Sequence, residues 1–338
     1  MNTEQSIKDF VSMKNLEKIV FTPGPGSLTE ENVMGLGPCF SRNDSEYLAT
    51  KEYVHKKILE LAGQKQIASF QGSGTLAIEI AINNFVYGKV LVVSTGFYSN
   101  RVGDLVRSFS ELYKVVTQVE EIDWKDINSV TEKFDWVLAC PVETSVGLLV
   151  PITDLRLLAQ RSGAKLFLDA TASIGLEAGH ELADVVTFSS CKGLFGLTGG
   201  SFITHNNEPT FEPKNFYMKL ATHANKRTTG AYHAIQSLHH TLDNHEALKQ
   251  SVIVNKQVFI DRFAEYLIFP KENQPLLCTQ LNQQILTDNP NVVLYESRHP
   301  IDGSVVCHIG ELHLGRRAQG RIIEELYVAM AAIGAKKI

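Results

Sequence analysis

The chain carries an acid and an amine at the ends of two apolar stretches that a β-sheet could bring together. One stretch begins at residue 165 and ends on Asp169, and the other begins at residue 184 and runs into Lys192 and a glycine. The acid and the amine are 23 residues apart. Ligands of α/β proteins bind beside the carboxyl ends of strands, because the loops open a crevice there. We therefore expect Asp169 and Lys192 to hold one cofactor between them.

A glycine-bearing turn earlier in the chain has the form of an anion site. The sequence Gln-Gly-Ser-Gly-Thr at 71–75 follows an apolar stretch and precedes a helical one. Backbone N–H groups in such a turn can approach a phosphate, and the helix dipole favours the negative charge. Ser73 and Thr75 can add hydroxyl donors, and Gly74 permits close approach. A plain strand-to-helix turn accounts for the same residues equally well when they are considered alone.

The same turn can be compared with two known nucleotide-binding motifs, the dinucleotide fingerprint and the Walker loop. Gly72, Gly74 and Ala77 match the dinucleotide fingerprint, which requires an acid at the end of the following strand to hold a ribose hydroxyl. That strand ends at 93–96 on Val-Ser-Thr-Gly, so the nicotinamide interpretation loses most of its support. A Walker loop is excluded because no Gly-Lys-Ser/Thr follows.

Two further loops belong to the same predicted sheet edge. Tyr98 follows the strand that ends near residue 94, and Thr144 lies in a polar, glycine-bearing loop at 141–147. Pyridoxal phosphate requires an amine, a carboxylate against its ring nitrogen, an anion site and a ring partner. Four loops at one sheet edge supply these four groups. This favours a single pyridoxal-phosphate site over the interpretation that the four loops have no common function.

Composition limits the classes of protein that the chain can represent. It has 338 residues, with 44% hydrophobic and 20% charged residues and a formal net charge of −5, which argues against a nucleic-acid-binding protein. The five cysteines are scattered without CxxC spacing, so we expect reduced thiols and no metal site. No signal peptide and no apolar run of about 18 residues is present, so we expect a cytoplasmic protein without membrane contact.

Alternating apolar strands and helices predict an α/β fold with a seven-stranded, mostly parallel sheet. Strand candidates lie at 67–70, 90–93, 114–119, 136–140, 166–168, 185–189 and 201–204, and helices at 45–63, 75–85, 99–109 and 152–161. A nearly continuous helix is expected over 232–269, followed by strands at 292–296 and 304–309 and a helix at 316–333. We expect a large cofactor-binding domain over 1–250 and a small α+β domain over 251–338.

The motifs at these strand ends resemble one known family. The chain is similar to the class V aminotransferases of pyridoxal-phosphate fold type I, above all to the 2-aminoethylphosphonate–pyruvate and alanine–glyoxylate (serine–pyruvate) transaminases. The similar segments are FTPGPG at 21–26, QGSGTLAIE at 71–79, STGFYSNR at 94–101, PVETSVGLLVP at 141–151, LDATASIG at 168–175 and SSCKGLFG at 189–196. They occur in order and at similar spacings, mostly in the large domain.

The resemblance implies a role for each matching residue. Lys192 falls on the Schiff-base lysine, the catalytic residue of the family, and Asp169 on the acid that protonates the pyridine nitrogen. The other cofactor positions are the phosphate loop (Ser73, Gly74, Thr75), the stacking aromatic (Tyr98), a hydroxyl near the ring oxygen (Thr144), and a hydroxyl that reaches the phosphate of the neighbouring subunit (Thr229). The last match implies a homodimer.

One position departs from the family pattern. These transaminases hold the substrate carboxylate with an arginine late in the small domain, just before a segment that resembles residues 308–311 here. Residues 303–307 of this chain contain no arginine, and Arg298 and the arginines at 316–317 do not match the position. Arg42 resembles an N-terminal arginine of the family and is the candidate for substrate binding. Pro141 also stands where relatives often carry histidine.

These features predict transfer of an amino group from a small amine or amino acid, such as a 2-aminoethylphosphonate-like donor, to a 2-oxo acid such as pyruvate or glyoxylate. The missing arginine is compatible with a donor that lacks a carboxylate. Two alternatives stay open: a lyase of the same fold, such as a desulfurase, and a protein that binds the cofactor without turnover. The aromatic Tyr98 disfavours the desulfurase, which usually stacks a histidine on the ring.

Overall fold

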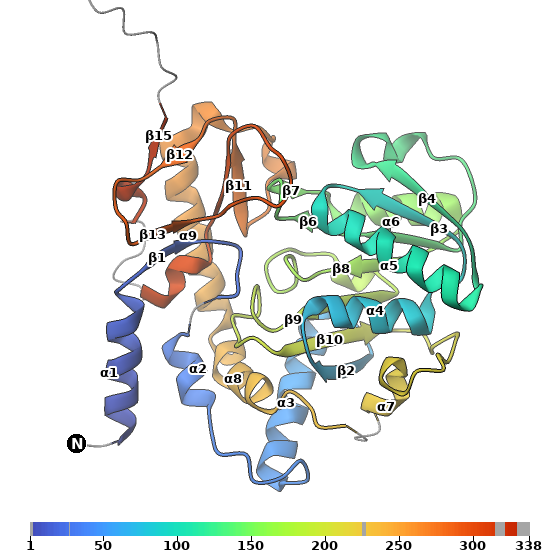
Figure 1. Ribbon diagram of the computed structural model, residues 1–338, viewed down its shortest axis with the longest axis horizontal. Coiled ribbons are helices and arrows are strands. Elements are labelled where there is room, and N and C mark those ends of the chain that lie inside the picture. The colour runs from blue at the N-terminus through green and yellow to red at the C-terminus, as the bar shows by residue number, and fades with distance from the viewer. Residues whose placement is uncertain (1–2, 27, 225–227, 315–321, 330–338) are drawn as a thin grey trace, which may run out of the picture.

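A seven-stranded sheet forms the centre of the molecule in the computed structural model, which describes residues 3–26, 28–224, 228–314 and 322–329 (Figure 1). β10 is antiparallel to both of its neighbours, and the other adjacent pairs are parallel. In spatial order the strands are β2 (Gln66–Gln71), β10 (Gly200–His205), β9 (Val185–Ser189), β8 (Lys165–Asp169), β5 (Trp136–Ala139), β3 (Gly88–Ser94) and β4 (Val116–Asp123). The predicted mostly parallel sheet of seven strands is confirmed.

Helices bury both faces of this sheet. α4 (Gly74–Phe85) and α5 (Phe97–Tyr113) pack on one face, and α3 (Ser45–Ala62), α6 (Ile152–Ser162) and α8 (Tyr232–Asp243) pack on the other. Successive strand residues alternate between the two cores, because side chains point to opposite faces of a strand. With both faces covered, the strand ends remain as the place for a ligand.

The helices predicted over 45–63 and 232–269 agree with the structure to different extents. For α3, Asp44 accepts a hydrogen bond from the Tyr47 N–H at 3.0 Å, and Gly63 in the left-handed region (φ 62°) ends the helix as expected. The nearly continuous helix predicted over 232–269 consists of α8 and α9 (His245–Phe263), interrupted only at Asn244, and a 3₁₀ turn (Ala264–Tyr266) follows. The helical region ends three residues earlier than predicted.

Short sheets make up the C-terminal part, packed beside α9 (Figure 1). β11 (Cys278–Leu281) pairs with β14 (Ser304–Cys307), β12 (Ile285–Leu286) with β15 (Tyr327–Val328), and β13 (Val292–Leu294) with the N-terminal β1 (Ile19–Phe21). Two of these strands lie where the sequence predicts strands, at 292–296 and 304–309. The helix predicted over 316–333 is wrong for residues 322–329, which form a 3₁₀ turn (Ile322–Glu325) and β15; its other parts lie outside the described residues.

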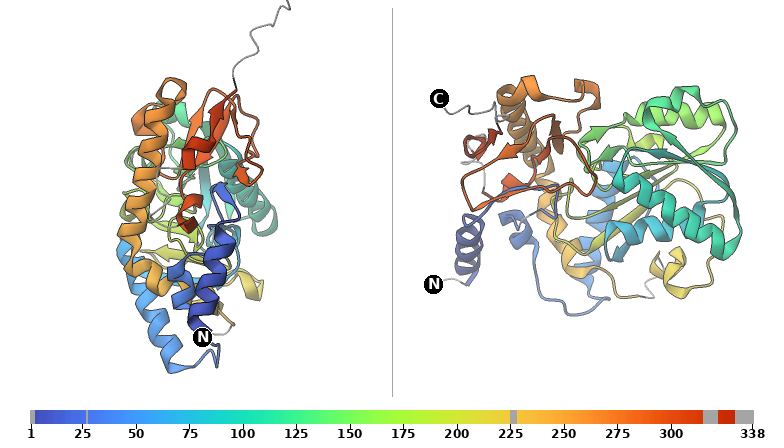
Figure 2. Two further views of the ribbon diagram at one scale, coloured as in Figure 1. Left: turned by 90° about the vertical axis from the view of Figure 1, so that its left-hand side faces the viewer. Right: turned by 45° about the horizontal axis from the view of Figure 1, so that its top comes forward.

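The remaining elements flank these layers. They are α1 (Thr3–Asn15), α2 (Glu30–Gly35) and α7 (Leu220–Ala224), with the short hairpin of β6 (Val142–Glu143) and β7 (Leu148–Leu149). The division at residue 250 stays a prediction, since α9 crosses that position without a break. Figure 2 shows α9 extending from the C-terminal sheets towards α8. Within the described ranges, no helix is long and apolar enough to span a bilayer.

Candidate active site

Asp169 and Lys192 follow neighbouring parallel strands at the carboxyl edge of the sheet. Asp169 is the last residue of β8 and is 2% exposed, while Lys192 lies three residues after the end of β9. The Oδ1 atom of Asp169 accepts hydrogen bonds from the Thr171 N–H at 3.1 Å and from the Thr171 hydroxyl at 2.6 Å. The second carboxylate oxygen receives no hydrogen bond from any residue that the structure describes, so it can serve a ligand.

The Lys192 amine points to an aromatic ring rather than to an acid. Its Nζ atom lies 5.4 Å from the centroid of the Tyr98 ring and forms no ion pair within the described parts of the chain. The turn after it is fixed by Phe195, whose N–H donates to the Lys192 carbonyl at 2.8 Å with a backbone in the left-handed region (φ 58°). A bulky residue in that region marks strain, which proteins retain mainly at functional sites.

The N-terminal segment closes over the lysine from the other side. The Gly26 N–H donates to the Cys191 carbonyl at 2.9 Å. A Cβ atom on Gly24, where φ is 123°, would lie 3.1 Å from Cγ of Lys192 and 3.2 Å from the Cys191 oxygen. Glycine at position 24 therefore lets the backbone approach the lysine side chain closely.

The glycine turn has the expected form, between β2 and the first turn of α4. Ser73 is the N-cap residue, but its side chain makes no capping hydrogen bond, and the Thr75 hydroxyl has no partner among the described residues. Gly74 is buried, and a Cβ atom there would lie 2.7 Å from Oγ1 of Thr171. The turn thus leaves two hydroxyls and the free N–H groups of a helix start available to an anion.

Glu143 holds Tyr98 in place and was not recognised in the sequence. Its Oε2 atom accepts from the N–H groups of Tyr98 at 2.9 Å and Ser99 at 3.1 Å, at the start of α5. Its Oε1 atom accepts from the N–H of Ser145 at 3.1 Å and from the Ser145 hydroxyl. The signal in the sequence was Gly96, the N-cap of α5, because a helix start without a capping side chain needs donors satisfied from elsewhere.

Thr144 and Cys140 are both buried in the segment that follows β5. The Thr144 hydroxyl is buried and makes no hydrogen bond to the described residues, which is costly unless a ligand supplies a partner. Burial raises the pKa of the Cys140 thiol, and the charges of Asp169 and Glu143 raise it further. Cys140 is therefore an inert buried thiol rather than a nucleophile.

The residues around Lys192 fit pyridoxal phosphate. An amine, a buried carboxylate with one free oxygen, an aromatic ring and an anion-binding turn surround the same strand ends. The buried Thr144 hydroxyl, which has no partner in the described chain, adds a group that a bound ligand could satisfy. Of the residues expected from the sequence, the structure groups Asp169, Lys192 and Tyr98 in this way.

Two expected site residues lie apart from this group. Arg42 is exposed in the turn before α3, and Thr229 is exposed before α8. Neither contacts Lys192, Asp169 or Tyr98 in the described chain. The roles implied for them by resemblance, substrate binding and a contact with a second subunit, stay predictions.

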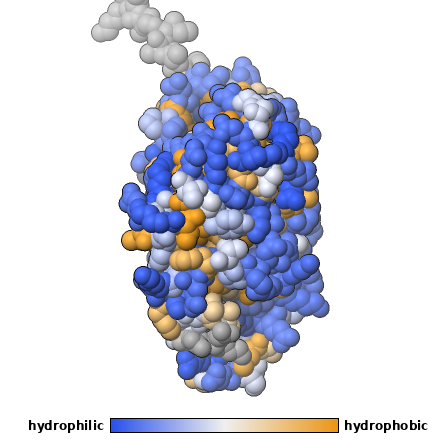
Figure 3. All heavy atoms as spheres, turned by 90° about the vertical axis from the view of Figure 1, so that its right-hand side faces the viewer, coloured by the Kyte–Doolittle hydropathy of each residue, from blue (hydrophilic) through white to orange (hydrophobic). Residues whose placement is uncertain are grey.

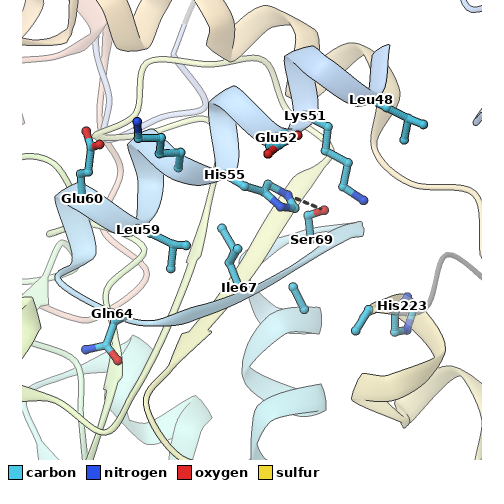
Figure 4. Close-up of a pocket in the computed structure, with 13 residues that line it drawn as sticks. Leu48, Lys51, Glu52, His55, Leu59, Glu60, Gln64, Ile67, Ser69 and His223 are labelled. Carbon is cyan, nitrogen blue, oxygen red and sulfur yellow. Dashed lines mark hydrogen bonds between the residues drawn. The ribbon is translucent and has the colours of Figure 1, made fainter. Parts of the chain in front are cut away.

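A separate groove lies between α3 and β2 and has a volume of about 890 Å³. A nitrogen of His55 lies there 3.1 Å from the Ser69 hydroxyl (Figure 4). Burial, with the nearby charge of Lys51, lowers the pKa of His55 to about 4. His239, His240 and Asp243 on α8 have the geometry to hold a metal ion. Neither feature includes the lysine or its neighbours.

The face of the molecule at the β4 edge of the sheet is mainly hydrophilic, with hydrophobic residues in small groups (Figure 3).

No protein-family model matches the chain. It is 26% identical over 250 residues to a 2-aminoethylphosphonate–pyruvate transaminase of Pseudomonas aeruginosa, covering 69% of this chain and 67% of that protein. It is 27% identical over 212 residues to the transaminase of the same name from Bacillus cytotoxicus, covering 56% of each chain. Among solved structures, alanine–glyoxylate aminotransferase from Nostoc sp. matches with a TM-score of 0.75 at 17% identity, over 91% of this chain and 94% of that one.

The same fold also carries other activities. Pyridoxamine–pyruvate aminotransferase from Mesorhizobium loti matches with a TM-score of 0.73 at 16% identity, over 92% of this chain and 93% of that one. A cysteine desulfurase from Thermococcus onnurineus matches with a TM-score of 0.65 at 16% identity, over 91% and 94%. The sheet order and the likeness to these solved structures show the fold of fold-type I aminotransferases. With the sequence relatives, they place this chain in the class V family of pyridoxal-phosphate-dependent aminotransferases, as a distant homologue of the 2-aminoethylphosphonate–pyruvate transaminases.

Proposed function

We propose that this aminotransferase moves an amino group from a small amine or amino acid, of the 2-aminoethylphosphonate type, to a 2-oxo acid such as pyruvate or glyoxylate. The observation that carries the proposal is the Lys192 amine, which lies 5.4 Å from the Tyr98 ring without an acid partner in the described chain. The sequence relatives named above support the choice of donor and acceptor.

The proposed cofactor contacts come from the strand-end loops. Ser73, Gly74 and Thr75 would bind the phosphate, Tyr98 would stack on the ring, and Thr144 would donate to the ring oxygen. Asp169 would hold its free carboxylate oxygen against the ring nitrogen. Thr229 of a second subunit would complete the phosphate site in a homodimer, and Arg42 would bind substrate.

Pyridoxal phosphate supplies an electron sink for the carbanion that forms when the amine-bearing carbon loses a proton. Lys192 has two roles in the chain's own chemistry. Its Nζ atom would be the attachment point for the cofactor and would take up the proton from the substrate carbon. The buried carboxylate of Asp169 would face the ring nitrogen, where low polarity strengthens the interaction.

A lyase of the same fold is the alternative. Cys140 and Cys307 are buried thiols whose pKa burial raises, so neither is a ready nucleophile, whereas Cys39 is exposed and Cys191 is half-buried beside Lys192. A protein that binds cofactor without turnover is the other alternative, and product formation separates it from a transaminase.

The test begins with colour and covalent attachment. The purified protein with pyridoxal phosphate should be yellow, and borohydride should bleach it and add the mass of the reduced cofactor to the chain. Lys192→Ala should lose this added mass and the turnover of 2-aminoethylphosphonate with pyruvate. Lys56→Ala, at an exposed position of α3, is the control and should keep both. A colourless wild type, or a fully active Lys192→Ala variant, contradicts the proposal.

A further inference from the structure

Arg298, in the part of the chain that packs against the candidate site, has no acid partner among the described residues. Arg298 is exposed in the segment that follows β13, and its guanidinium carbon lies 5.6 Å from the centroid of the Phe97 ring. Among the residues that the structure describes, it makes no hydrogen bond and no ion pair. A guanidinium has five N–H donors in a planar fork. Those of Arg298 are therefore available to a ligand.

The segment that carries Arg298 is fixed against the sheet-end loops. The Ser297 hydroxyl donates to the Ser145 carbonyl, and the His299 N–H donates back to the Ser297 hydroxyl at 3.1 Å. Tyr295 lies against Tyr98: burial raises the pKa of its hydroxyl, and the neighbouring Tyr98 raises it further. The position of Arg298 is thus set by tertiary contacts with the same loops that position Tyr98.

Two adjacent rings connect Arg298 to the lysine. The rings of Phe97 and Tyr98 lie edge to face, with centroids 5.2 Å apart, and Arg298 approaches the first ring as Lys192 approaches the second. Neither nearby buried acid pairs with Arg298 in the described chain. Glu143 accepts four hydrogen bonds from backbone N–H groups and from the Ser145 hydroxyl, and Asp169 accepts two from Thr171. The guanidinium of Arg298 therefore has no acid partner among the described residues.

The geometry points to Arg298 as the specificity-determining residue that binds the acid group of the amine substrate, a carboxylate or a phosphonate. The inference rests on the proposed transamination at Lys192. A guanidinium fork pairs with either acid through two parallel hydrogen bonds. Arg298 would thereby supply, from a different position, the arginine that residues 303–307 lack.

Two other arginines differ from Arg298 in position. Arg101 also faces the Tyr98 ring, with its guanidinium carbon 4.9 Å from the centroid, and its buried Nε atom has no hydrogen-bond partner in the described chain. Arg101 and Tyr98 are three apart on α5, so their contact is a local helix pair. Arg42 contacts none of the residues around Lys192. Arg298 reaches Phe97 across 201 residues of chain, which only the tertiary fold can arrange.

The test compares Arg298→Met and Arg298→Lys with the control Arg107→Met. Arg107 lies more than two turns along α5 from Tyr98 and pairs with Glu121 at the surface. Binding of propylphosphonate and of propionate, which carry the acid but no amine, is measured by calorimetry. The cofactor-loaded proteins are then mixed with 2-aminoethylphosphonate, β-alanine or propylamine, and the absorbance change gives the half-saturating concentration and the limiting rate of each.

We expect Arg298→Met to weaken binding of the preferred acid by about tenfold or more, the usual effect of a charged hydrogen-bond partner. The half-saturating concentration of the matching amine should rise equally, while its limiting rate and the reaction of the uncharged propylamine stay unchanged. Arg298→Lys should bind the acid with an affinity between those of the wild type and Arg298→Met. Arg107→Met should match the wild type in both measurements. The wild type's preference between the two acids identifies the substrate group as carboxylate or phosphonate.

Two results overturn the inference in different ways. If the wild type reacts with acidic amines and Arg298→Met binds both acids as tightly as the wild type, Arg298 is not the acid-binding residue and the proposed transamination stands. An equal loss with propylamine also overturns it, because the effect is then not on the acid group. If the cofactor-loaded wild type reacts with none of the amines, the proposed function fails and the inference fails with it.

Discussion

Oε2 of Glu143 accepts a hydrogen bond from the backbone N–H of Tyr98 at 2.9 Å, although 45 residues separate them. The carboxylate is fully buried and replaces the cap that Gly96 does not provide at the start of α5. A charged acceptor at a helix start is favoured by the helix dipole as well as by the hydrogen bonds. Glu143 therefore positions the ring of Tyr98 through the backbone that carries it.

Glu143→Gln should weaken this arrangement. The amide of glutamine has one acceptor oxygen, whereas the carboxylate has two. Its NH₂ group would face N–H donors on one side, so at least one of those N–H groups loses its acceptor. We expect the free energy of unfolding to fall by about 1–3 kcal/mol, measured by urea denaturation. Cofactor affinity should fall as well, because the Tyr98 ring is no longer held. Glu111→Gln, at an exposed position of α5, is the control; equal effects of the two changes would contradict the role of Glu143.

Thr144→Val tests the buried hydroxyl without a partner. Valine has nearly the same shape, and no hydrogen bond within the described chain is lost, so the stability of the cofactor-free protein should stay within about 0.5 kcal/mol or increase. The dissociation constant of pyridoxal phosphate should rise by up to about tenfold, measured by absorbance titration. Unchanged cofactor affinity would remove Thr144 from the proposed site.

The control for this change is Thr187→Val. Thr187 is equally buried, but its hydroxyl donates to the Leu168 carbonyl at 3.2 Å. Its loss removes a buried hydrogen bond and should lower the free energy of unfolding by about 0.5–1.5 kcal/mol. If Thr144→Val destabilises the cofactor-free protein as much as Thr187→Val does, the Thr144 hydroxyl has a partner within the protein.

The sequence predicted those parts of the fold and site that depend on local patterns. Short apolar runs and glycine turns located the seven strands and the loops that carry Asp169, Lys192 and Tyr98, because strand ends of a parallel sheet gather at one edge. The break at Asn244 was missed, since apolar spacing continues on both sides and only tertiary packing separates α8 from α9.

Contacts between distant segments could not be predicted from those patterns. Glu143 looked like one polar residue of a loop, and nothing in its neighbours indicates that it caps α5. Arg298 was noted only as failing to match a family position, because its contact with Phe97 depends on the docking of the segment after β13. The pairing of β1 with β13 likewise joins the two ends of the chain, and periodicity within each strand carries no information about its partner.

Gly24→Ala should strain the contact between the N-terminal segment and the lysine. The backbone there has φ of 123°, which side-chain-bearing residues rarely adopt, and the new Cβ would lie 3.1 Å from Cγ of Lys192. We expect a loss of about 1–3 kcal/mol in the free energy of unfolding and slower attachment of the cofactor. Gly26→Ala is the matched control, since its Cβ would meet only the Cys191 oxygen at 3.7 Å. Equal effects of the two variants would contradict this assignment.

His308 makes stability depend on pH. Burial, with the charge of Lys256, lowers its pKa to about 3, and its ring bonds to the Thr279 hydroxyl at 2.9 Å. The unfolded chain therefore binds a proton below about pH 6.5 that the folded chain does not. The stabilising contribution is fully present above pH 6.5 and is lost as the pH falls towards 3.

His308→Gln should flatten this dependence. Between pH 6 and pH 4 each such histidine contributes a slope of up to about 1.4 kcal/mol per pH unit, so the variant should lose that part of the wild-type slope in urea denaturation curves. Half-buried His55 and buried His180, each with its pKa lowered to about 4, still contribute to the slope in the variant. The same change at the exposed His233 should leave the slope unchanged. A slope in His308→Gln as steep as that of the wild type would mean that His308 takes up a proton in the folded protein as readily as in the unfolded chain.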